Sequence, residues 1–258
     1  MKKKPNKKPA VPGVKRIAFI PDSHHPNVDR LAWTLLLKAL RHFEPDILVI
    51  GGDFADCAPL SMHAPHHTKQ EYLLDEMYEV NAALNQLDQL GARKKIYIEG
   101  NHENRLTRYI CKQAQALDGL LSIPRMLHLQ ERGWSWVPYG TTYQLGKMHI
   151  THDIGQAGMN AHRTAASAHM GSTIINHTHR MAYEVRGTFG GLPYLAAMFG
   201  WLGDRKTAAT YMHEAKTRSE WALGFGLGHM IEETGVVFVQ PVPIVDYRCL
   251  VGTDIISL

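Results

Sequence analysis

Five short polar clusters in the chain combine residue types that bind metal ions. They are Asp22-Ser23-His24, Gly52-Asp53-Phe54-Ala55-Asp56, Gly100-Asn101-His102-Glu103, His152-Asp153 and His177-Thr178-His179. Their candidate ligand atoms are imidazole nitrogens and carboxylate or amide oxygens, without a cysteine thiolate. Mixed nitrogen and oxygen ligands of this kind suit Mn, Fe, Zn or Ni better than Ca or a cysteine-rich zinc site.

We take seven side chains from these clusters as candidate metal ligands. They are Asp22, His24, Asp53, Asn101, His152, His177 and His179. Alternate residues of an extended chain point the same way and lie roughly 6 to 7 Å apart. We therefore expect the two ligands of the first cluster, and the two histidines of the last, each to reach one place. Seven ligands exceed what one transition ion takes, but they suit two ions that share a carboxylate.

The charges of such a site indicate its chemistry. Two divalent ions carry +4, while Asp22, Asp53 and a bridging hydroxide carry −3, which leaves about +1 at the centre. A phosphate group would be drawn to this charge. Bound ions can lower the pKa of water to about 7, and two of them can hold both the nucleophile and a phosphoryl oxygen. The residue types therefore indicate hydrolysis of a phosphoester.

The clusters follow predicted strands. Short apolar runs predict strands over 17–20, 46–50, 95–98, 148–151 and 173–175. Apolar residues at helical spacing predict helices over 30–43 and 70–90. The alternation of strand, cluster and helix predicts an α/β domain whose strands share a direction. Ligand sites in such sheets form beyond the carboxyl ends of the strands, which is where the clusters stand.

The last third of the chain has a different pattern, with glycine-rich apolar segments over 190–203 and 223–228. Strand-like runs follow over 236–240 and 244–247. We interpret this part as a second sheet with hairpins that packs against the first. The apolar stretch 192–202 is interpreted as core, with a rim for a nucleobase or a subunit contact as alternatives.

In their order along the chain, the five clusters resemble the signature of calcineurin-like metallophosphoesterases, over residues 22–179. The resemblance implies a single α/β domain, a four-layer α/β/β/α metallophosphoesterase sandwich with a dinuclear metal centre at one edge. It implies that one metal is held by Asp22, His24 and His179 and the other by Asn101, His152 and His177, with Asp53 bridging them.

Three further residues are assigned to catalysis. The resemblance implies that His102 contacts the substrate phosphate and gives a proton to the leaving oxygen, and that Asp56 orients it. The planar guanidinium of Arg105 suits a second phosphate contact, although a solvated charge explains this residue equally well. Glu103 is interpreted as a partner of the N-terminus of the following helix and not as a catalyst.

Several residues near the clusters leave alternatives open. Asn176 and Asp153 stand where glycine is usual in the family, without removing a ligand. Strand alternation predicts that His149 points away from His152, and His25 either lines the pocket or covers it. Three loop histidines either rim the cleft or lie in a plain exposed loop. They are His63, His66 and His67.

The resemblance implies a dinuclear metal-dependent phosphohydrolase in which a metal-bridging hydroxide attacks phosphorus directly. Two divalent transition-metal ions would be the cofactors, with Mn first and Fe, Zn or Ni as alternatives. Within the family the chain is most similar to small phosphoesterases encoded by phages and prophages, partly on segments 221–226 and 240–244. Because nucleic acid dominates phage metabolism, we expect a phosphodiesterase acting on nucleotides or nucleic-acid ends. A phosphomonoesterase acting on nucleotides or phosphoproteins is the alternative.

The chain has 258 residues and a net charge of +4, and its positive charge is concentrated at the N-terminus. Residues 1–16 hold seven basic residues and no acidic one, so the remainder carries −3. We expect a disordered basic tail over 1–16 and a metallophosphoesterase domain over 17–258. The tail either solubilises the protein or binds nucleic acid, and in the second case the enzyme would be a tail-tethered DNA nuclease.

The composition is that of an ordinary soluble globular protein, with 45% hydrophobic and 20% charged residues. The chain has neither an apolar run long enough for a membrane span nor a secretion signal, so we expect a cytoplasmic protein with no membrane partner. For a phage-encoded protein this means the host cytoplasm. The three cysteines are too few and too widely spaced for a disulfide framework. The oligomeric state stays open.

Overall fold

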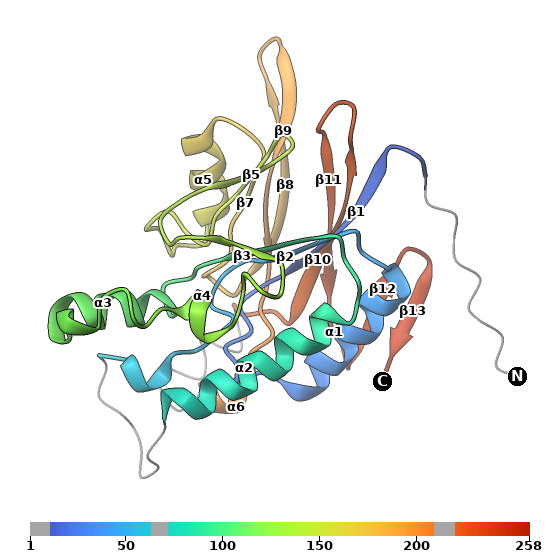
Figure 1. Cartoon of the computed structure of the whole chain (residues 1–258). Coiled ribbons are helices and arrows are strands. Elements are labelled where there is room, and N and C mark those ends of the chain that lie inside the picture. The colour runs from blue at the N-terminus through green and yellow to red at the C-terminus, as the bar shows by residue number, and fades with distance from the viewer. Residues whose placement is uncertain (1–10, 63–71, 209–219) are drawn as a thin grey trace, which may run out of the picture.

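Two β-sheets pack face to face in the computed structural model, which describes residues 11–62, 72–208 and 220–258 (Figure 1). The six-stranded sheet has the order β11-β10-β1-β2-β3-β4 and the five-stranded sheet the order β5-β6-β7-β9-β8. The first comprises β1 (Val14–Ile20), β2 (Ile47–Ile50), β3 (Lys94–Ile98), β4 (Trp134–Val137), β10 (Gly224–Ile231) and β11 (Val237–Pro243). The second comprises β5 (Tyr143–Leu145), β6 (Met148–Ile150), β7 (Thr173–Ile174), β8 (Met181–Thr188) and β9 (Gly191–Phe199).

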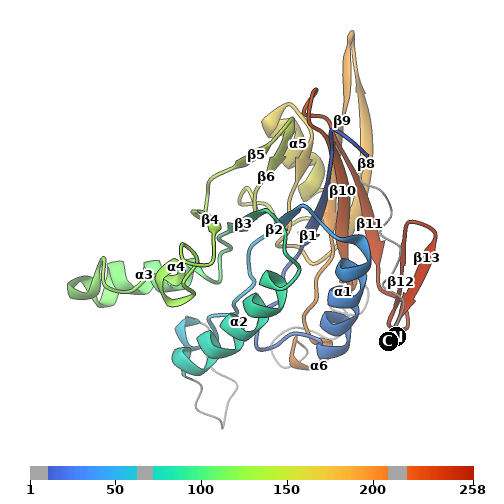
Figure 2. The same ribbon diagram turned by 45° about the vertical axis from the view of Figure 1, so that its right-hand side comes forward.

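The helices cover the outer faces of the two sheets. Helices α1 (Arg30–Phe43) and α2 (Leu73–Asp88) lie on the six-stranded sheet, and α5 (Ala161–His169) lies on the five-stranded one. The remaining helices are α3 (Asn104–Gln113), α4 (Ile123–Met126), α6 (Arg205–Ala208) and the short 3₁₀ turns η1 (Ala58–Leu60) and η2 (Gln115–Leu117). A small hairpin of β12 (Arg248–Val251) and β13 (Asp254–Ser257) packs beside α1. Figure 2 shows α3 and the β8–β9 hairpin projecting from the body.

Strand β1 shows why the sheets form a sandwich. Its residues alternate between two apolar cores, as the two-residue period of a strand requires. Ile17 and Phe19 join the core between the sheets, where the Phe19 ring lies 5.3 Å from that of Phe199. Ala18 and Ile20 join the core under the helices. The four-layer α/β/β/α arrangement predicted from the sequence is therefore confirmed.

The positions of several strands correct the sequence analysis. β6 and β7 belong to the second sheet and do not continue the parallel series of β1 to β4, while β10 and β11 join the first sheet antiparallel. Strands of two or three residues are too short for their apolar pattern to indicate a sheet partner. The predicted strand over 244–247 is wrong, because an isolated bridge and a turn precede β12 there.

The N-terminal boundary also differs from the expectation. β1 begins at Val14, so Lys15 and Arg16 lie in the sheet and not in a tail. Arg16 is held there by a backbone N–H hydrogen bond of 2.9 Å to Asp46 and a side-chain hydrogen bond of 2.9 Å to the Phe43 carbonyl. Residues 1–10 lie outside the described part of the chain. In the described part, no helix is long and apolar enough to cross a membrane.

Candidate metal centre

The candidate ligands meet where strand ends of both sheets come together. Asp22, Asp53 and Asn101 follow β1, β2 and β3 of the first sheet. His152 follows β6, and the two histidines of the last cluster follow β7, in the second sheet. Five loops thus converge on one edge of the sandwich, as ligand sites in α/β sheets do.

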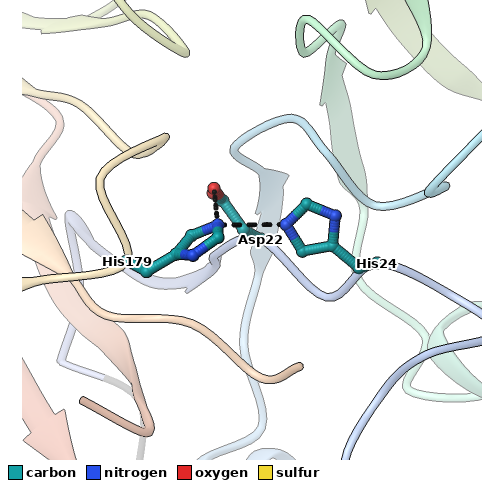
Figure 3. A group of neighbouring side chains, drawn as sticks. All are labelled: Asp22, His24 and His179. Atoms are coloured by element: carbon teal, nitrogen blue, oxygen red, sulfur yellow. Dashed lines mark hydrogen bonds and ion pairs between the residues drawn. The ribbon is translucent and has the colours of Figure 1, made fainter. Parts of the chain in front are cut away.

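One group of ligand atoms comprises Asp22, His24 and His179, which are all buried (Figure 3). The Nε2 atom of His179 lies 3.2 Å from Asp22 Oδ2 and 3.0 Å from His24 Nε2. One carboxylate oxygen and two imidazole nitrogens therefore point at a common centre. This donor set fits a divalent transition-metal ion.

A second group comprises Asp53, His152 and His177. His152 Nε2 lies 3.3 Å from Asp53 Oδ2 and 3.0 Å from Asn101 Oδ1, which adds the amide oxygen to this group. Asp53 also forms a cluster with His24 and His102, so it stands between the two groups. The structure thus brings together all seven candidate ligands, and its donor atoms fit two ions that share Asp53.

The backbone reaches this arrangement through left-handed turns and not through the extended alternation that we expected. His24, Asp53, His177 and His179 have φ angles of 50°, 48°, 68° and 58°. Asp22 and His24 still meet, but the two histidines of the last cluster enter different groups. Each left-handed non-glycine residue costs on the order of 1 to 3 kcal/mol, and such strain concentrates at functional sites.

Close backbone approach explains a glycine beside the ligands. A Cβ atom on Gly100 would lie 2.1 Å from Asp53 Oδ1 and 2.2 Å from the Asp53 backbone nitrogen. No side chain larger than hydrogen fits there without moving the carboxylate. Gly100 therefore allows the loops after β2 and β3 to touch.

Glu103 has a role that the sequence analysis missed. It stands at the N-terminus of α3, as predicted, but its side chain makes no capping bond there and it is fully buried. Its carboxylate accepts hydrogen bonds of 2.8 to 3.0 Å from the Tyr97 hydroxyl and the backbone N–H groups of Asp53, Phe54, Ala55 and Gly100. Burial and the charge of Asp53 raise its pKa. Glu103 thus ties the loops after β2 and β3 together beneath Asp53.

The Glu103→Gln substitution is expected to lower the free energy of unfolding by about 2 to 4 kcal/mol, because the amide leaves at least two buried N–H groups without an acceptor. Denaturant unfolding of the protein in EDTA measures the change. Glu131→Gln, at an exposed position, is the matched control. An unfolding free energy equal to that of the unsubstituted protein would show that the carboxylate does not hold these loops.

The expected catalytic residues lie together at the rim of the site. His102 Nδ1 is 2.7 Å from Asp56 Oδ1 and 2.9 Å from the Asp56 carbonyl, and its Nε2 is 3.8 Å from Asp53 Oδ2. Arg105 donates from Nη1 to the Asp56 carbonyl at 2.8 Å and from Nη2 to His102 Nε2 at 3.0 Å. The guanidinium is therefore part of the site and not merely a solvated charge.

Asp56 connects His102 to the candidate ligand His24. Besides His102, its carboxylate binds His24 Nδ1 at 3.2 Å and accepts a hydrogen bond of 2.6 Å from the Asn27 amide. Burial alone would raise the pKa of Asp56, but hydrogen bonds from the two histidines hold it below its usual value. Asp56 is thus ionised at neutral pH. Asn27 carries no sequence signal that marks it as a partner of this site.

The two departures from the family pattern leave the ligands in place. The Asn176 amide donates to the Gly51 carbonyl at 3.1 Å, and His152 Nδ1 lies 2.9 Å from the same oxygen. Asp153 accepts a hydrogen bond of 2.7 Å from the Gly155 N–H. Asn176 therefore supports the loop that also orients His152.

The remaining histidines are placed outside the ligand groups. His25 is buried, and its ring contacts the core residues Trp33 and Phe54. The His149 ring stacks on that of His169 in α5, with centroids 5.0 Å apart. This agrees with the prediction that His149 points away from His152. His63, His66 and His67 lie outside the described residues.

Burial and neighbouring charges set the protonation of the ligands before metal binds. Burial alone would lower the pKa of His24, but the hydrogen bond and charge of Asp56 raise it to about 9. Burial would likewise lower the pKa of His152, but the charge and hydrogen bond of Asp53 outweigh burial and raise this pKa to about 10. Burial lowers the pKa of His179 to about 4. At pH 7 one histidine in each group therefore carries a proton that a metal must displace.

Metal affinity is consequently expected to rise with pH. Each ion displaces one proton while the pH is below the raised pKa of its histidine, so each affinity should rise by up to about tenfold per pH unit. The increase should level off at about pH 9 for the group of His24 and at about pH 10 for the group of His152. Calorimetric titration in buffers of different ionisation enthalpy measures both the affinity and the protons released. Affinities that stay constant up to these pH values would contradict the protonation assigned to His24 and His152.

The chain was compared with known proteins. A family model described as calcineurin-like phosphoesterase matches residues 15–200, which include all five clusters. The comparison with curated proteins gave no match. Among solved structures, vacuolar protein sorting 29 from Cryptosporidium parvum is 12% identical, with a TM-score of 0.44 over 95% of this chain and 99% of that one.

Two enzymes are among the other similar structures. The phosphoesterase YfcE from E. coli is 14% identical, with a TM-score of 0.43 over 86% of this chain and 96% of its own. A phosphatase from Mycoplasma pneumoniae is 12% identical, with a TM-score of 0.47 over 90% of this chain and 94% of its own.

Proposed function

The chain belongs to the calcineurin-like phosphoesterase family and is a metal-dependent phosphoester hydrolase, and on this basis we propose that its seven candidate ligands hold two metal ions. One ion would be held by Asp22, His24 and His179 and the other by Asn101, His152 and His177, with Asp53 between them. The observation that carries this proposal is the position of the Asp53 carboxylate, which clusters with His152 and His177 on one side and with His24 of the first group on the other. We propose manganese as the first metal to test, since the donors are nitrogen and oxygen without thiolate.

The metals and the protein would divide the chemistry between them. When bound, two divalent ions supply a water of lowered pKa and positive charge beside a phosphoryl oxygen. The protein holds the ligands before substrate arrives, because Glu103 and Gly100 place Asp53 and because Asp56 orients His24. Such preorganisation removes reorganisation cost from the reaction step.

His102 is suited to give a proton to the leaving oxygen. Its Nδ1 is hydrogen-bonded to the Asp56 carboxylate, which fixes the orientation of the ring. Its Nε2 is on the side of the ring that faces Asp53 and therefore the metal groups. The leaving alkoxide would then depart as an alcohol.

The hydrogen bond from Arg105 controls whether His102 Nε2 can carry the proton. A guanidinium only donates hydrogen bonds, so the contact of Nη2 with His102 Nε2 requires this nitrogen to be unprotonated. A phosphate oxygen is a stronger acceptor for a guanidinium than an imidazole nitrogen is. Substrate binding would thus draw Arg105 to the phosphate and free Nε2 to carry the proton.

We propose a phosphodiester, in a nucleotide or at a nucleic-acid end, as the substrate. The support is the resemblance to small phage and prophage phosphoesterases that we infer from the sequence, partly from segments 221–226 and 240–244. A hydrolysis panel with added Mn²⁺ tests it, comparing an activated diester, an activated monoester, cyclic nucleotides and DNA. Faster diester hydrolysis supports the proposal, and faster monoester hydrolysis favours a phosphomonoesterase acting on nucleotides or phosphoproteins. Hydrolysis no faster than that of the Asp53→Asn protein would contradict both.

The basic N-terminus offers a separate test of a tethered DNA nuclease. We propose that the domain begins at Val14, with the preceding lysines as a tail. If the tail holds DNA, its deletion should flatten the dependence of DNA affinity on salt, by about one unit of slope for each phosphate that the lysines neutralise. An unchanged slope would reject tethering without bearing on the metal centre.

A further inference from the structure

Metal-binding histidines usually donate their second ring N–H to a carboxylate, a carbonyl or water, and this bond sets the orientation of the ring. His24 and His152 follow the rule, with Nδ1 lying 3.2 Å from Asp56 Oδ1 and 2.9 Å from the Gly51 carbonyl. His177 and His179 do not, because the Nδ1 atom of each is buried and has no hydrogen-bond partner among the described residues. Figure 3 shows the Nδ1 atom of His179 turned away from Asp22 and His24.

Two tryptophans contact the His179 ring instead. The Trp201 indole is stacked on it, with centroids 4.9 Å apart and planes inclined by 16°. The Trp221 indole meets it edge-on, with centroids 4.2 Å apart and planes inclined by 84°. The two indoles also touch each other, at 4.8 Å. Face and edge contacts together limit both the tilt and the sideways movement of the imidazole.

The backbone joins these indoles to the ligands. Next to Trp201, the Leu202 N–H donates to the Asp22 carbonyl at 2.8 Å. Next to Trp221, the Ala222 N–H donates to the His179 carbonyl at 3.0 Å, while the Trp201 N–H donates to the Ala222 carbonyl at 3.0 Å. Backbone hydrogen bonds therefore link the segments of the two indoles directly to those of Asp22 and His179.

Core packing alone explains these residues poorly. Trp201 is 1% exposed, yet its indole N–H has no hydrogen-bond partner in the described part of the chain. A buried donor without a partner is costly, and an aliphatic or phenyl side chain would avoid that cost. What the indole adds is a broad flat face against the imidazole, since stacked aromatic pairs contribute beyond the area they bury.

We propose that Trp201 and Trp221 are positioning residues that orient His179 for metal binding, in place of the usual hydrogen bond to its second ring nitrogen. The inference rests on the proposed metal role of His179. It concerns only the group of Asp22, His24 and His179. The second group has its own orienting contact at His152, so it should not depend on the indoles.

The test is a Co²⁺ titration of the metal-depleted full-length chain, followed by calorimetry, tryptophan emission and the visible absorption of the bound ion. In the unsubstituted protein one of the two binding steps should quench the tryptophan emission. This is the binding of the ion held by His179, whose ring contacts both indoles. Trp201→Leu and Trp221→Leu should weaken that step by about 10- to 100-fold, the usual cost of losing an orienting partner, and alter the Co²⁺ absorption. Trp201→Phe should restore most of the affinity.

Trp136→Phe, in β4, is the matched control and should change neither step. Leucine variants that bind both ions like the unsubstituted protein, with the same absorption, would overturn the inference. So would a titration in which both steps leave the emission unchanged. If Trp201→Leu does not fold, Trp221→Leu and Trp201→Phe decide the question. Failure of the unsubstituted protein to bind two ions would instead count against the proposed metal centre.

Discussion

The His102→Ala protein is expected to keep both metal ions and to lose about 10²- to 10⁴-fold in kcat on an unactivated phosphodiester, the usual contribution of a positioned general acid. His102 is not among the seven candidate ligands, and its side chain is at the rim, where it is bonded to Asp56 and Arg105. Metal analysis and steady-state kinetics measure the two quantities separately.

An activated substrate provides the control for this variant. A leaving group of low pKa departs without a proton, so its hydrolysis should fall much less than that of an unactivated ester. Equal losses on both substrates would indicate that His102 acts on binding or on the metals. Full activity on the unactivated substrate would reject the acid role.

The Asp53→Asn protein is expected to lose metal and activity together. Asp53 belongs to the group of His152 and His177 and also clusters with His24 of the other group. Its replacement by a neutral amide should therefore lower the affinity for each ion by at least the roughly 10- to 100-fold that a supporting residue contributes. The fold should persist, because Asn can still accept the 2.9 Å hydrogen bond from the His102 N–H. Metal content after dialysis, kcat and circular dichroism measure the three properties.

Asp75→Asn, at an exposed position of α2, is the matched control and should behave like the unsubstituted protein. Retention of two ions and of turnover by the Asp53→Asn protein would show that this carboxylate does not join the metal groups.

Much of the fold could be predicted because long elements carry their own periodicity. The helix expected over 30–43 coincides with α1, which begins after Asp29 and ends before the left-handed Glu44. The helix expected over 70–90 is shorter, at Leu73–Asp88. The partners of β6 and β7 could not be predicted, since elements of three and two residues have no pattern that distinguishes one sheet from the other.

The candidate ligands could be located for a related reason. Each follows a strand, and the order of the clusters carries a family resemblance that no single cluster has. The residues that support them carry no such signal. Glu103 is at the start of a helix, where an acidic residue is ordinary, and its five hydrogen-bond donors come from segments up to 50 positions away. The contacts of Trp201 and Trp221 with His179 likewise exist only in the folded chain.

The most direct test of the central claim is electron paramagnetic resonance of the chain loaded with Mn²⁺, combined with its metal stoichiometry. Two groups of ligands with Asp53 between them should hold two ions per chain, close enough for their spins to couple, and the coupled signal should be absent from the Asp53→Asn protein. A single ion per chain, or two ions with uncoupled signals, would contradict a shared dinuclear centre.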